Sequence, residues 1–244
     1  VFYKSFEEEK YAYSQYDKIV FVSEAIRVAF GEMFGIELVQ NAAVCYNPLE
    51  AKTIRRMAEA YEVAHDKFTI CAVGRVIPEK GFLRLTSICE HMVEDGRDFT
   101  LNIVGDGKEY DRLKEMVECH HLEKWEHLIG FQENPYPYIQ ACDVYIQPSR
   151  YEGKCVTVRE AQMLGKPVII TNYETAKEQL ESGVEGIIVP MQNQECADQI
   201  FDLLNNNCLL EQLSFNCQMR KYSNKEEVKK IYRILEKSNC VGKR

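Results

Sequence analysis

Two glutamates, Glu152 and Glu160, stand in one stretch with seven residues between them and could present a pair of carboxylates to a ligand. The stretch reads as strand, loop, helix and turn. A β-prone run covers 143–147, and a helix starts near Cys155 and stops at Gly165, where glycine fits a left-handed C-terminal cap. Helical side chains lean toward the N-terminus of their helix, so Glu160 should point back at the loop that holds Glu152. A carboxylate on a mostly apolar face needs a partner, which is either a ligand or a nearby lysine, unless the side chain swings out to solvent.

The helical wheel divides this central helix into two sides. Arg159, Gln162 and Lys166 share one side, which we expect to face solvent. The apolar residues share the other side with Glu160. The helix should therefore cover a sheet with one side only.

Cations that could hold a phosphate follow a second strand. The buried run 68–73 leads into the segment Gly74–Gly81, which contains Arg75 and Lys80. Arginine offers a planar fork to phosphate oxygens, and lysine offers a point charge. Ligands of open α/β sheets lie at the carboxyl ends of the strands, so the chemistry should gather at such loops. The start of the central helix, 153–157, adds free backbone N–H groups and a positive dipole end, which suit a diphosphate. The alternative for the two cations is a pair of solvated surface charges.

Three further segments could be functional. Val104-Gly105-Asp106-Gly107 begins like a dinucleotide-binding fingerprint, but Tyr110 occupies the place of its third glycine. A tight structural turn is the better interpretation, and a dinucleotide oxidoreductase is disfavoured. The segment Phe131–Tyr138 lines a base pocket or forms a Pro-rich connection, and both can hold. Cys119-His120-His121 is expected at the exposed end of a helix, because no second cluster has metal-ligand spacing.

Composition and the pattern of apolar residues along the chain limit the classes of protein to consider. From Phe68 onward, apolar strands alternate with helices over most of the 244 residues, which predicts an α/β fold with a doubly wound parallel sheet. The net charge of −8 argues against nucleic acid as a partner. No run of 18 apolar residues could span a membrane. The ten cysteines form no Cys-x-x-Cys pairs, and several (Cys71, Cys89, Cys142) lie in apolar runs, which is typical of reduced thiols in a cytoplasm.

These stretches resemble the retaining nucleotide-sugar glycosyltransferases of family 4, which have the GT-B fold of two Rossmann domains. The resemblance covers about Lys18 to Val189. Its motifs are the Glu-x7-Glu spacing with Pro148-Ser149, Glu152-Gly153, Glu160-Ala161 and Gly165-Lys-Pro-Val-Ile169, and the Gly-Arg…Glu-Lys-Gly loop at 74–81.

The resemblance implies a role for each candidate residue. Arg75 and Lys80 bind the donor diphosphate, Glu160 holds the ribose hydroxyls, and Glu152 lies beside the donor sugar. The catalytic candidates are therefore Glu152, Arg75 and Lys80. The donor-binding candidates are Gly74, Arg75, Lys80, Phe131, Glu152, Gly153, Lys154, Cys155, Val156, Thr157 and Glu160.

The implied reaction moves a sugar from a nucleotide-sugar, UDP-linked by expectation, to a carbohydrate or lipid-linked acceptor with retention. This is a hexosyltransferase-type step of polysaccharide biosynthesis, placed in the cytoplasm with peripheral contact on the inner membrane face. No cofactor and no metal is expected, because these loops contain no Asp-x-Asp and cations serve the diphosphate. Lys154 and Cys155 replace an aromatic and a small residue of the family, and Lys154 reaches a phosphate or an acidic sugar or is simply solvated. The alternative function is a non-catalytic nucleotide-binding subunit of a split transferase.

Three segments follow from the same resemblance. Residues 1–46 correspond to the last helix, strand and helix of an N-terminal acceptor domain with its linker, and 47–224 to the nucleotide-sugar-binding Rossmann-like domain. Residues 225–244 form a helix and tail that return toward the N-terminal domain. The rest of an acceptor domain is expected elsewhere. We therefore expect this chain alone to bind a nucleotide, to transfer no sugar, and to form a homodimer or be poorly soluble.

Overall fold

The computed structural model describes residues 5–241 apart from 66 and 97. The chain divides into two compact units, Glu50–Tyr222 and the pair of segments Val1–Leu49 and Ser223–Arg244. We call the first the sheet unit and the second the terminal unit. None of the helices in the described part of the chain combines the length and the apolarity that crossing a bilayer requires.

The sheet unit is built on six parallel strands in the order β5-β4-β3-β6-β7-β8. The strands β3, β4 and β5 follow one another toward one edge of the sheet, and β6, β7 and β8 follow one another toward the other edge. The winding direction therefore reverses between β3 and β6. This confirms the predicted doubly wound sheet. The strands are β3 (Thr69–Val73), β4 (Thr100–Val104), β5 (Glu126–Gly130), β6 (Val144–Gln147), β7 (Val168–Thr171) and β8 (Gly186–Val189).

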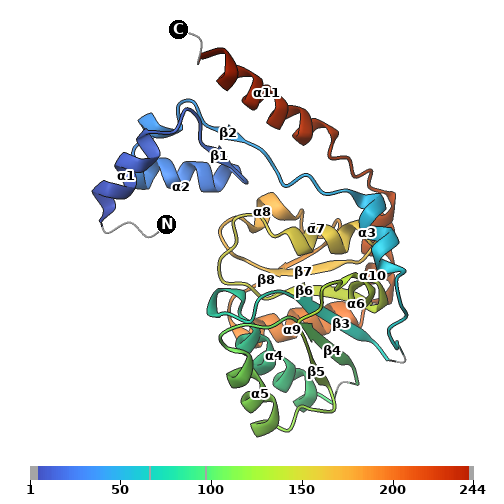
Figure 1. Ribbon diagram of the computed structural model, residues 1–244. Helices are drawn as coiled ribbons and strands as arrows, with labels where there is room; N and C mark the ends of the chain where they lie inside the picture. The colour runs from blue at the N-terminus through green and yellow to red at the C-terminus, as the bar shows by residue number, and fades with distance from the viewer. Residues whose placement is uncertain (1–4, 66, 97, 242–244) are drawn as a thin grey trace. The chain divides into compact units, whose positions relative to one another are not determined.

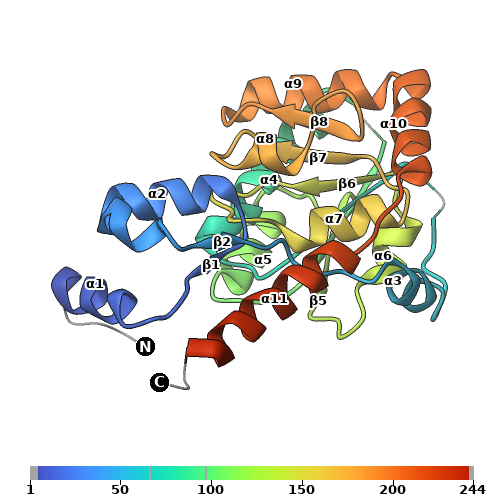
Figure 2. The same cartoon turned by 90° about the horizontal axis from the view of Figure 1, so that it is seen from above.

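Helices cover both faces of this sheet (Figures 1 and 2). One face carries α4 (Phe82–Glu94), α5 (Tyr110–Cys119) and α9 (Asn193–Leu204), with α4 packed against both of the others. The other face carries α3 (Ala51–Ala58), α6 (Tyr136–Ala141) and α7 (Val156–Met163). The short helices η2 (Pro78–Lys80) and α8 (Ala176–Gln179) lie in loops, and α10 (Asn207–Met219) packs against α7 and α9.

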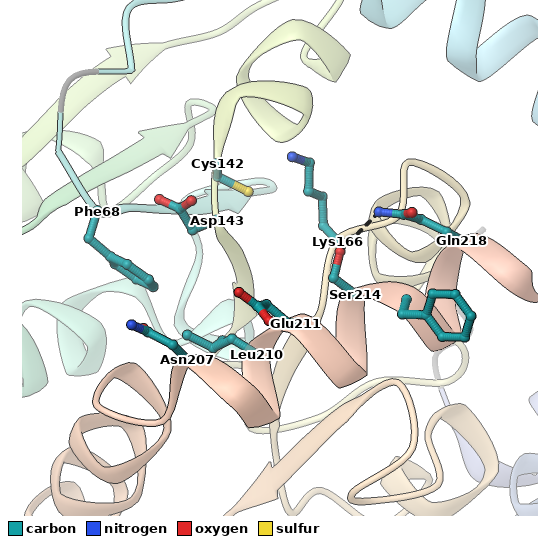
Figure 3. A pocket seen from close by; sticks show the side chains of 10 residues that line it. Phe68, Cys142, Asp143, Lys166, Asn207, Leu210, Glu211, Ser214 and Gln218 are labelled. Atoms are coloured by element: carbon teal, nitrogen blue, oxygen red, sulfur yellow. Dashed lines mark hydrogen bonds between the residues drawn. The ribbon is translucent and has the colours of Figure 1, made fainter.

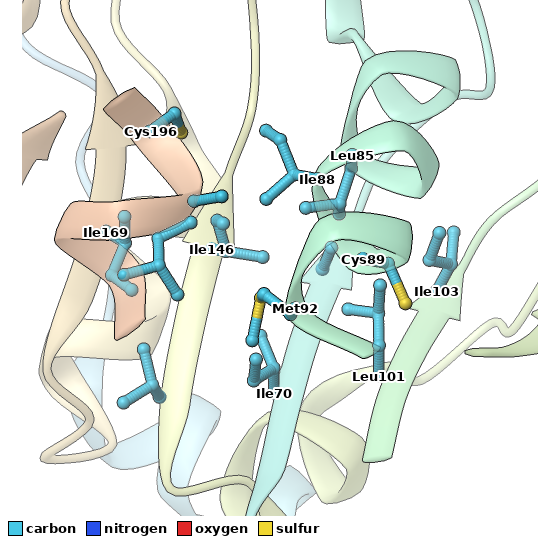
Figure 4. Packing of buried hydrophobic residues seen from close by; sticks show 14 of the residues in the cluster. Ile70, Leu85, Ile88, Cys89, Met92, Leu101, Ile103, Ile146, Ile169 and Cys196 are labelled. Carbon is cyan, nitrogen blue, oxygen red and sulfur yellow. The ribbon is translucent and has the colours of Figure 1, made fainter. Parts of the chain in front are cut away.

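The main core lies between the sheet and the α4–α5–α9 layer (Figure 4). Alternation along β3 sends Ile70 and Ala72 into this layer, where they meet Ile88 and Met92 of α4. Full burial of one such aliphatic side chain contributes roughly 1.5–3 kcal/mol. The same alternation along β6 sends Tyr145 to the opposite face, below α7.

Parallel register brings all six carboxyl ends to one edge of the sheet. Val73 of β3 pairs with Val104 of β4, and Thr171 of β7 pairs with Val189 of β8. The loops that follow the strands, including Gly74–Gly81, therefore gather at one edge, which we call the carboxyl edge. This is the edge where doubly wound sheets bind ligands.

The terminal unit contains a minimal parallel pair, β1 (Val20–Phe21) and β2 (Ala43–Val44). Its α2 (Glu24–Phe34) begins at Ser23, whose hydroxyl accepts the Ile26 amide. The other elements are α1 (Phe6–Ser14), η1 (Ile36–Val39) and α11 (Lys225–Val241). The expectations for residues 1–4 and 242–244 lie outside the described residues.

Aromatic packing and polar contacts hold the terminal unit together. Phe30 lies 4.7 Å from Tyr13, 4.7 Å from Phe34 and 5.1 Å from Phe21, measured between ring centroids. The Tyr46 amide donates to Glu227 of α11 at 2.8 Å. The helix that ends the chain is thus bonded to the segment after β2.

Candidate functional site

The predicted cation and carboxylate meet at the carboxyl edge of the sheet. Lys80 Nζ lies 2.6 Å from Glu152 Oε1, and the two side chains are only 19% and 10% exposed. Their loops touch because Gly81 has a φ of +72°, and a Cβ there would lie 2.3 Å from the Pro148 carbonyl oxygen. The Arg150 amide also donates to the Glu79 carbonyl at 2.8 Å. Only glycine permits this close approach at position 81.

A buried relay of hydrogen bonds fixes Glu152 from below. Tyr145 donates its hydroxyl to Gln147 Oε1 at 2.8 Å, and Gln147 Nε2 donates to Ser149 Oγ at 2.8 Å. Ser149 in turn donates to Glu152 Oε1 at 2.6 Å. Lys80 and Ser149 both use Oε1, so among the described residues Oε2 has no donor and is the oxygen left for a ligand.

The N-terminus of α7 is held in place by Gln179 of α8. The Cys155 amide donates to Gln179 Oε1 at 3.0 Å, and Gln179 Nε2 donates to the Cys155 carbonyl at 3.1 Å. Thr157 adds a hydroxyl bond to Gln147 at 3.2 Å. Within the described part of the chain, the amides of Val156 and Thr157 have no partner and remain as donors in this first turn. Burial, followed by the Glu152 carboxylate, raises the pKa of the Cys155 thiol to about 11, so this thiol stays protonated near neutral pH.

Lys154 is half-buried and donates to the Glu178 carbonyl. Burial and the neighbouring Arg159 guanidinium lower its pKa to about 8. The interpretation as a simply solvated lysine is therefore wrong, because the amine lies among protein groups. Contact with a phosphate or an acidic sugar stays a prediction.

Glu160 faces inward, as its place on the helix predicts, and is 8% exposed. Its Oε1 accepts the hydroxyl of Tyr136 at 2.8 Å, and burial raises the pKa of the carboxyl group. Tyr136 opens α6 directly after the segment that follows β5. The partner that this buried carboxylate needs is thus a tyrosine of the segment Phe131–Tyr138, which was expected at a base pocket and not beside Glu160.

A cavity of about 220 Å³ opens at the ends of β3, β4 and β5. Gly74, Arg75, Gly105, Phe131 and Pro135 are among its lining residues. A Cβ on Gly105 would lie 1.8 Å from the Gly74 carbonyl oxygen, so a glycine here lets the loop after β4 pack closely on the loop after β3. Phe131 is 73% exposed at the rim, where a flat ligand could stack on its ring.

A second cavity of about 460 Å³ lies at the edge of the sheet opposite to the carboxyl edge (Figure 3). Phe68, Asp143 and Lys166 line it, and each of them immediately precedes a strand or lies close before one. They therefore mark the amino ends of the strands. Glu211 and Ser214 of α10 complete its wall. The candidate site is the carboxyl edge.

The structure brings some predicted residues together and keeps others apart. Lys80 and Glu152 are in contact, and Arg75 and Phe131 line the small cavity. Glu160 accepts a hydrogen bond from Tyr136 at the start of α6. Residues that sequence reasoning missed support the site from beneath: Tyr145, Gln147, Thr175 and Gln179. The exposed end of α5 at Cys119 is confirmed, and the nine cysteines from Cys45 to Cys217 are free thiols.

The family model that matches this chain covers nearly the same residues as the sheet unit. The family model "Glycosyl transferases group 1" matches residues 53–226. An uncharacterized glycosyltransferase of Haemophilus influenzae is 28% identical over 192 residues, which cover 78% of this chain and 52% of that protein. A UDP-Gal:α-D-GlcNAc-diphosphoundecaprenol α-1,3-galactosyltransferase of Escherichia coli is 24% identical over 172 residues, covering 69% of this chain and 44% of that one. The chain spans about half the length of these curated relatives.

A solved structure shares the fold. The crystal structure of Anabaena HepE in complex with UDP and glucose superposes with a TM-score of 0.78 at 22% sequence identity, covering 92% of this chain and 64% of that chain. Together with the strand order, this likeness confirms the expected Rossmann-like domain of the GT-B type.

Proposed function

This chain belongs to the group 1 glycosyltransferases, and we propose from that premise that it moves a sugar from a UDP-linked donor to a carbohydrate or lipid-linked acceptor, with retention as in family 4. One observation carries the proposal. The Lys80–Glu152 pair, 2.6 Å apart, places a cation and a carboxylate at the carboxyl edge, beside the loop of Arg75. These are the charges that a sugar diphosphate requires at its two ends.

The donor has a natural place among these groups. We assign the base to the Phe131 cavity, the ribose hydroxyls to Glu160, and the diphosphate to Arg75, Lys80 and the first turn of α7. Charge-assisted bonds to phosphate are the strong ones, and a helix N-terminus adds amide donors. The sugar then lies against Gly153, with Glu152 Oε2 free to accept one of its hydroxyls.

The chemical step is electrostatic. The bond between the anomeric carbon and the phosphate oxygen breaks with its electron pair on the oxygen, while the acceptor hydroxyl bonds to the same face of that carbon and its proton passes to the leaving diphosphate. Lys80 and Arg75 stabilise the negative charge as it develops, which is the kind of term that dominates many enzymes. Because the Ser149 relay and Lys80 hold Glu152 in advance, little reorganisation is needed during the step.

Similar proteins support the nucleotide and the class of acceptor. The Escherichia coli relative is named for UDP-Gal and a diphosphoundecaprenol acceptor, and the HepE structure holds UDP and glucose. We extend this to a hexosyl donor, to polysaccharide biosynthesis, and to work at the cytoplasmic face of a membrane. A non-catalytic subunit and a dinucleotide oxidoreductase are not favoured, because the relatives are transferases and Gly105 serves loop packing.

The chain spans about half the length of its relatives, and this bears on the activity expected of the chain alone. We propose that this chain alone binds the donor, that transfer needs the remaining half of such an enzyme, and that the exposed apolar residues of the terminal unit favour a homodimer. Val28, Met33 and Ile36 are 46%, 64% and 74% exposed there. Light scattering tests the dimer, and a transfer assay beside a complete relative tests the activity.

A panel of nucleotides tests the donor directly. UDP, UDP-glucose, ADP, GDP and NAD are titrated against the chain by calorimetry. We expect UDP and one UDP-sugar to bind most tightly. Binding of NAD in preference to every UDP compound would contradict the proposed function.

A further inference from the structure

A third cavity, of about 570 Å³, opens at the ends of the other three strands. Arg150 follows β6, Asn172 follows β7, and Met191 follows β8, and all three line it. We call it the Arg84–Arg150 cavity. Its lining shares no residue with the Phe131 cavity at β3, β4 and β5. Its volume lies in the range of sites for small molecules.

Two guanidinium groups give this cavity its charge. Arg84 reaches it from α4 and donates Nη1 to the Met191 carbonyl at 3.0 Å, while its buried Nε has no hydrogen-bond partner. Burial lowers the pKa of Arg84, and the positive charge of Arg150 nearby lowers it further. Among the residues that the structure describes, neither arginine has a carboxylate within ion-pair distance. Two like charges held close without a counterion attract an anion.

The start of α9 adds to the positive character. This helix begins at Asn193, which lines the cavity, and its N-cap residue Gln192 makes no side-chain cap bond. The first amides of the helix and its positive dipole end therefore act in the same direction as the arginines.

Neutral and polar groups complete the lining. Tyr151 is 74% exposed and offers a ring, Asn172 offers an amide, and Glu174 offers a carboxylate that can accept hydroxyl protons. Tyr173, only 3% exposed, closes the wall. The cavity is far larger than a bare phosphate needs, and its uncharged polar groups match hydroxyls.

We propose that the Arg84–Arg150 cavity binds a phosphate ester of a polyhydroxylated molecule, such as a sugar phosphate, at a site separate from that of the nucleotide-sugar. The phosphate lies against the two guanidinium groups and the start of α9. The hydroxyls of the ligand lie against Tyr151, Asn172 and Glu174. Arg150 stands on the same loop as Glu152, so the ligand binds next to the donor loop in the chain.

Calorimetric titration of the chain with glucose 6-phosphate tests this, with glucose and inorganic phosphate as partial probes. We expect the ester to bind more tightly than either. Arg150→Ala removes one charge-assisted contact and should weaken the ester roughly tenfold or more, whereas Arg150→Lys should keep part of the affinity. Arg112→Ala, an exposed arginine on α5, is the matched control and should change nothing.

Variants of the two sites separate this proposal from the proposed function. The double variant Lys80→Ala/Glu152→Gln, which leaves no unpaired charge at the donor loop, should keep the affinity for glucose 6-phosphate, even if UDP does not bind at all. Loss of ester binding in this double variant with retention in Arg150→Ala would place the ester at the donor loop and overturn the proposal. No binding of the ester, or binding no tighter than that of glucose or of phosphate, would overturn it as well.

Hydrogen exchange gives a readout that needs no variant. Glucose 6-phosphate should protect the amides of 149–151 and 191–196 and leave those of 74–77 unchanged. Protection confined to 74–77 would contradict the proposal.

Discussion

Glu126 should make the stability of the sheet unit depend on pH in the direction opposite to that of most carboxylates. It begins β5, is 2% exposed, and accepts the Thr86 hydroxyl at 2.7 Å. Burial raises the pKa of its carboxyl group from 4.5 to about 7. Between these two values the folded protein holds the proton and the unfolded chain does not. The free energy of unfolding therefore falls as pH rises through this window and levels off above it.

The size of the effect follows from the pKa difference. One pKa unit corresponds to about 1.36 kcal/mol, so the full loss between pH 4.5 and pH 7 is on the order of 3 kcal/mol. Glu126→Gln keeps an acceptor for Thr86 and removes the titration. We expect the variant to match the parent near pH 4.5 and to exceed its stability by about this amount at pH 8.

Urea unfolding at several pH values from 4.5 to 8 measures the difference in the free energy of unfolding between variant and parent. The pH dependence that other titrating groups cause is the same in both proteins and cancels in this difference. Glu123→Gln, an exposed neighbour, is the matched control and should show no pH-dependent difference. A difference for Glu126→Gln that is the same at pH 4.5 and pH 8 would show that burial does not hold the proton on this carboxylate.

Two further predictions address the ribose contact and the carboxyl-edge turn. Glu160→Ala should weaken UDP binding more than Glu160→Gln does, because the glutamine amide can still bond to the vicinal ribose hydroxyls. Titration with UDP and with its 2′,3′-dideoxy analogue tests this. A Glu160→Ala chain that still prefers UDP over the analogue would refute the ribose assignment. Gly105→Ala should lower the free energy of unfolding by more than the roughly 1–3 kcal/mol that a strained backbone costs, because its Cβ also meets the Gly74 carbonyl at 1.8 Å. Gly96→Ala is the control, with a φ of +76° and open space around it, and equal losses for the two variants in urea unfolding would refute the contact.

Local chemistry predicted much of the central stretch correctly. The helix begins at Val156 after Cys155, and Gly165 has a φ of +77°, as a left-handed cap requires. Glycine and the amphipathic pattern act over a few residues, so a single sequence displays them. The contact of Lys80 with Glu152 rests instead on β3 lying beside β6, which the alternation of strands and helices does not fix.

The side of α7 that carries Gln162 shows where a helical-wheel pattern fails as a predictor of exposure. Gln162 was expected to face solvent, and that is wrong, because the side chain is fully buried and bonds to Glu185 at 3.2 Å. Helix α10 packs against this side of α7, and Arg220 just beyond it pairs with Glu185. Periodicity within one helix cannot show that a distant segment returns to cover it.

The relay beneath Glu152 was missed for a related reason. Tyr145 and Gln147 lie in a short β-prone run, where alternation alone marks them as buried strand residues. Their function comes from a chain of bonds through Ser149 that forms only when β6, its loop and α7 are assembled. Gln179, which holds the start of α7, comes from another helix 24 positions away.

The binding of UDP and of uridine by Lys80 variants tests the central claim most directly. Lys80→Ala alone leaves Glu152 unpaired and repelling phosphate, so the double variant Lys80→Ala/Glu152→Gln is compared with Glu152→Gln, from which it differs only in the cation. Lys108→Ala, an exposed lysine on the loop after β4, is the control. We expect the double variant to lose roughly tenfold or more in affinity for UDP, at about 1.5–3 kcal/mol for a bond to a charged group, and to bind uridine as the parent does. Equal losses for UDP and uridine, or no loss for either, would contradict the assignment of Lys80 to the donor diphosphate.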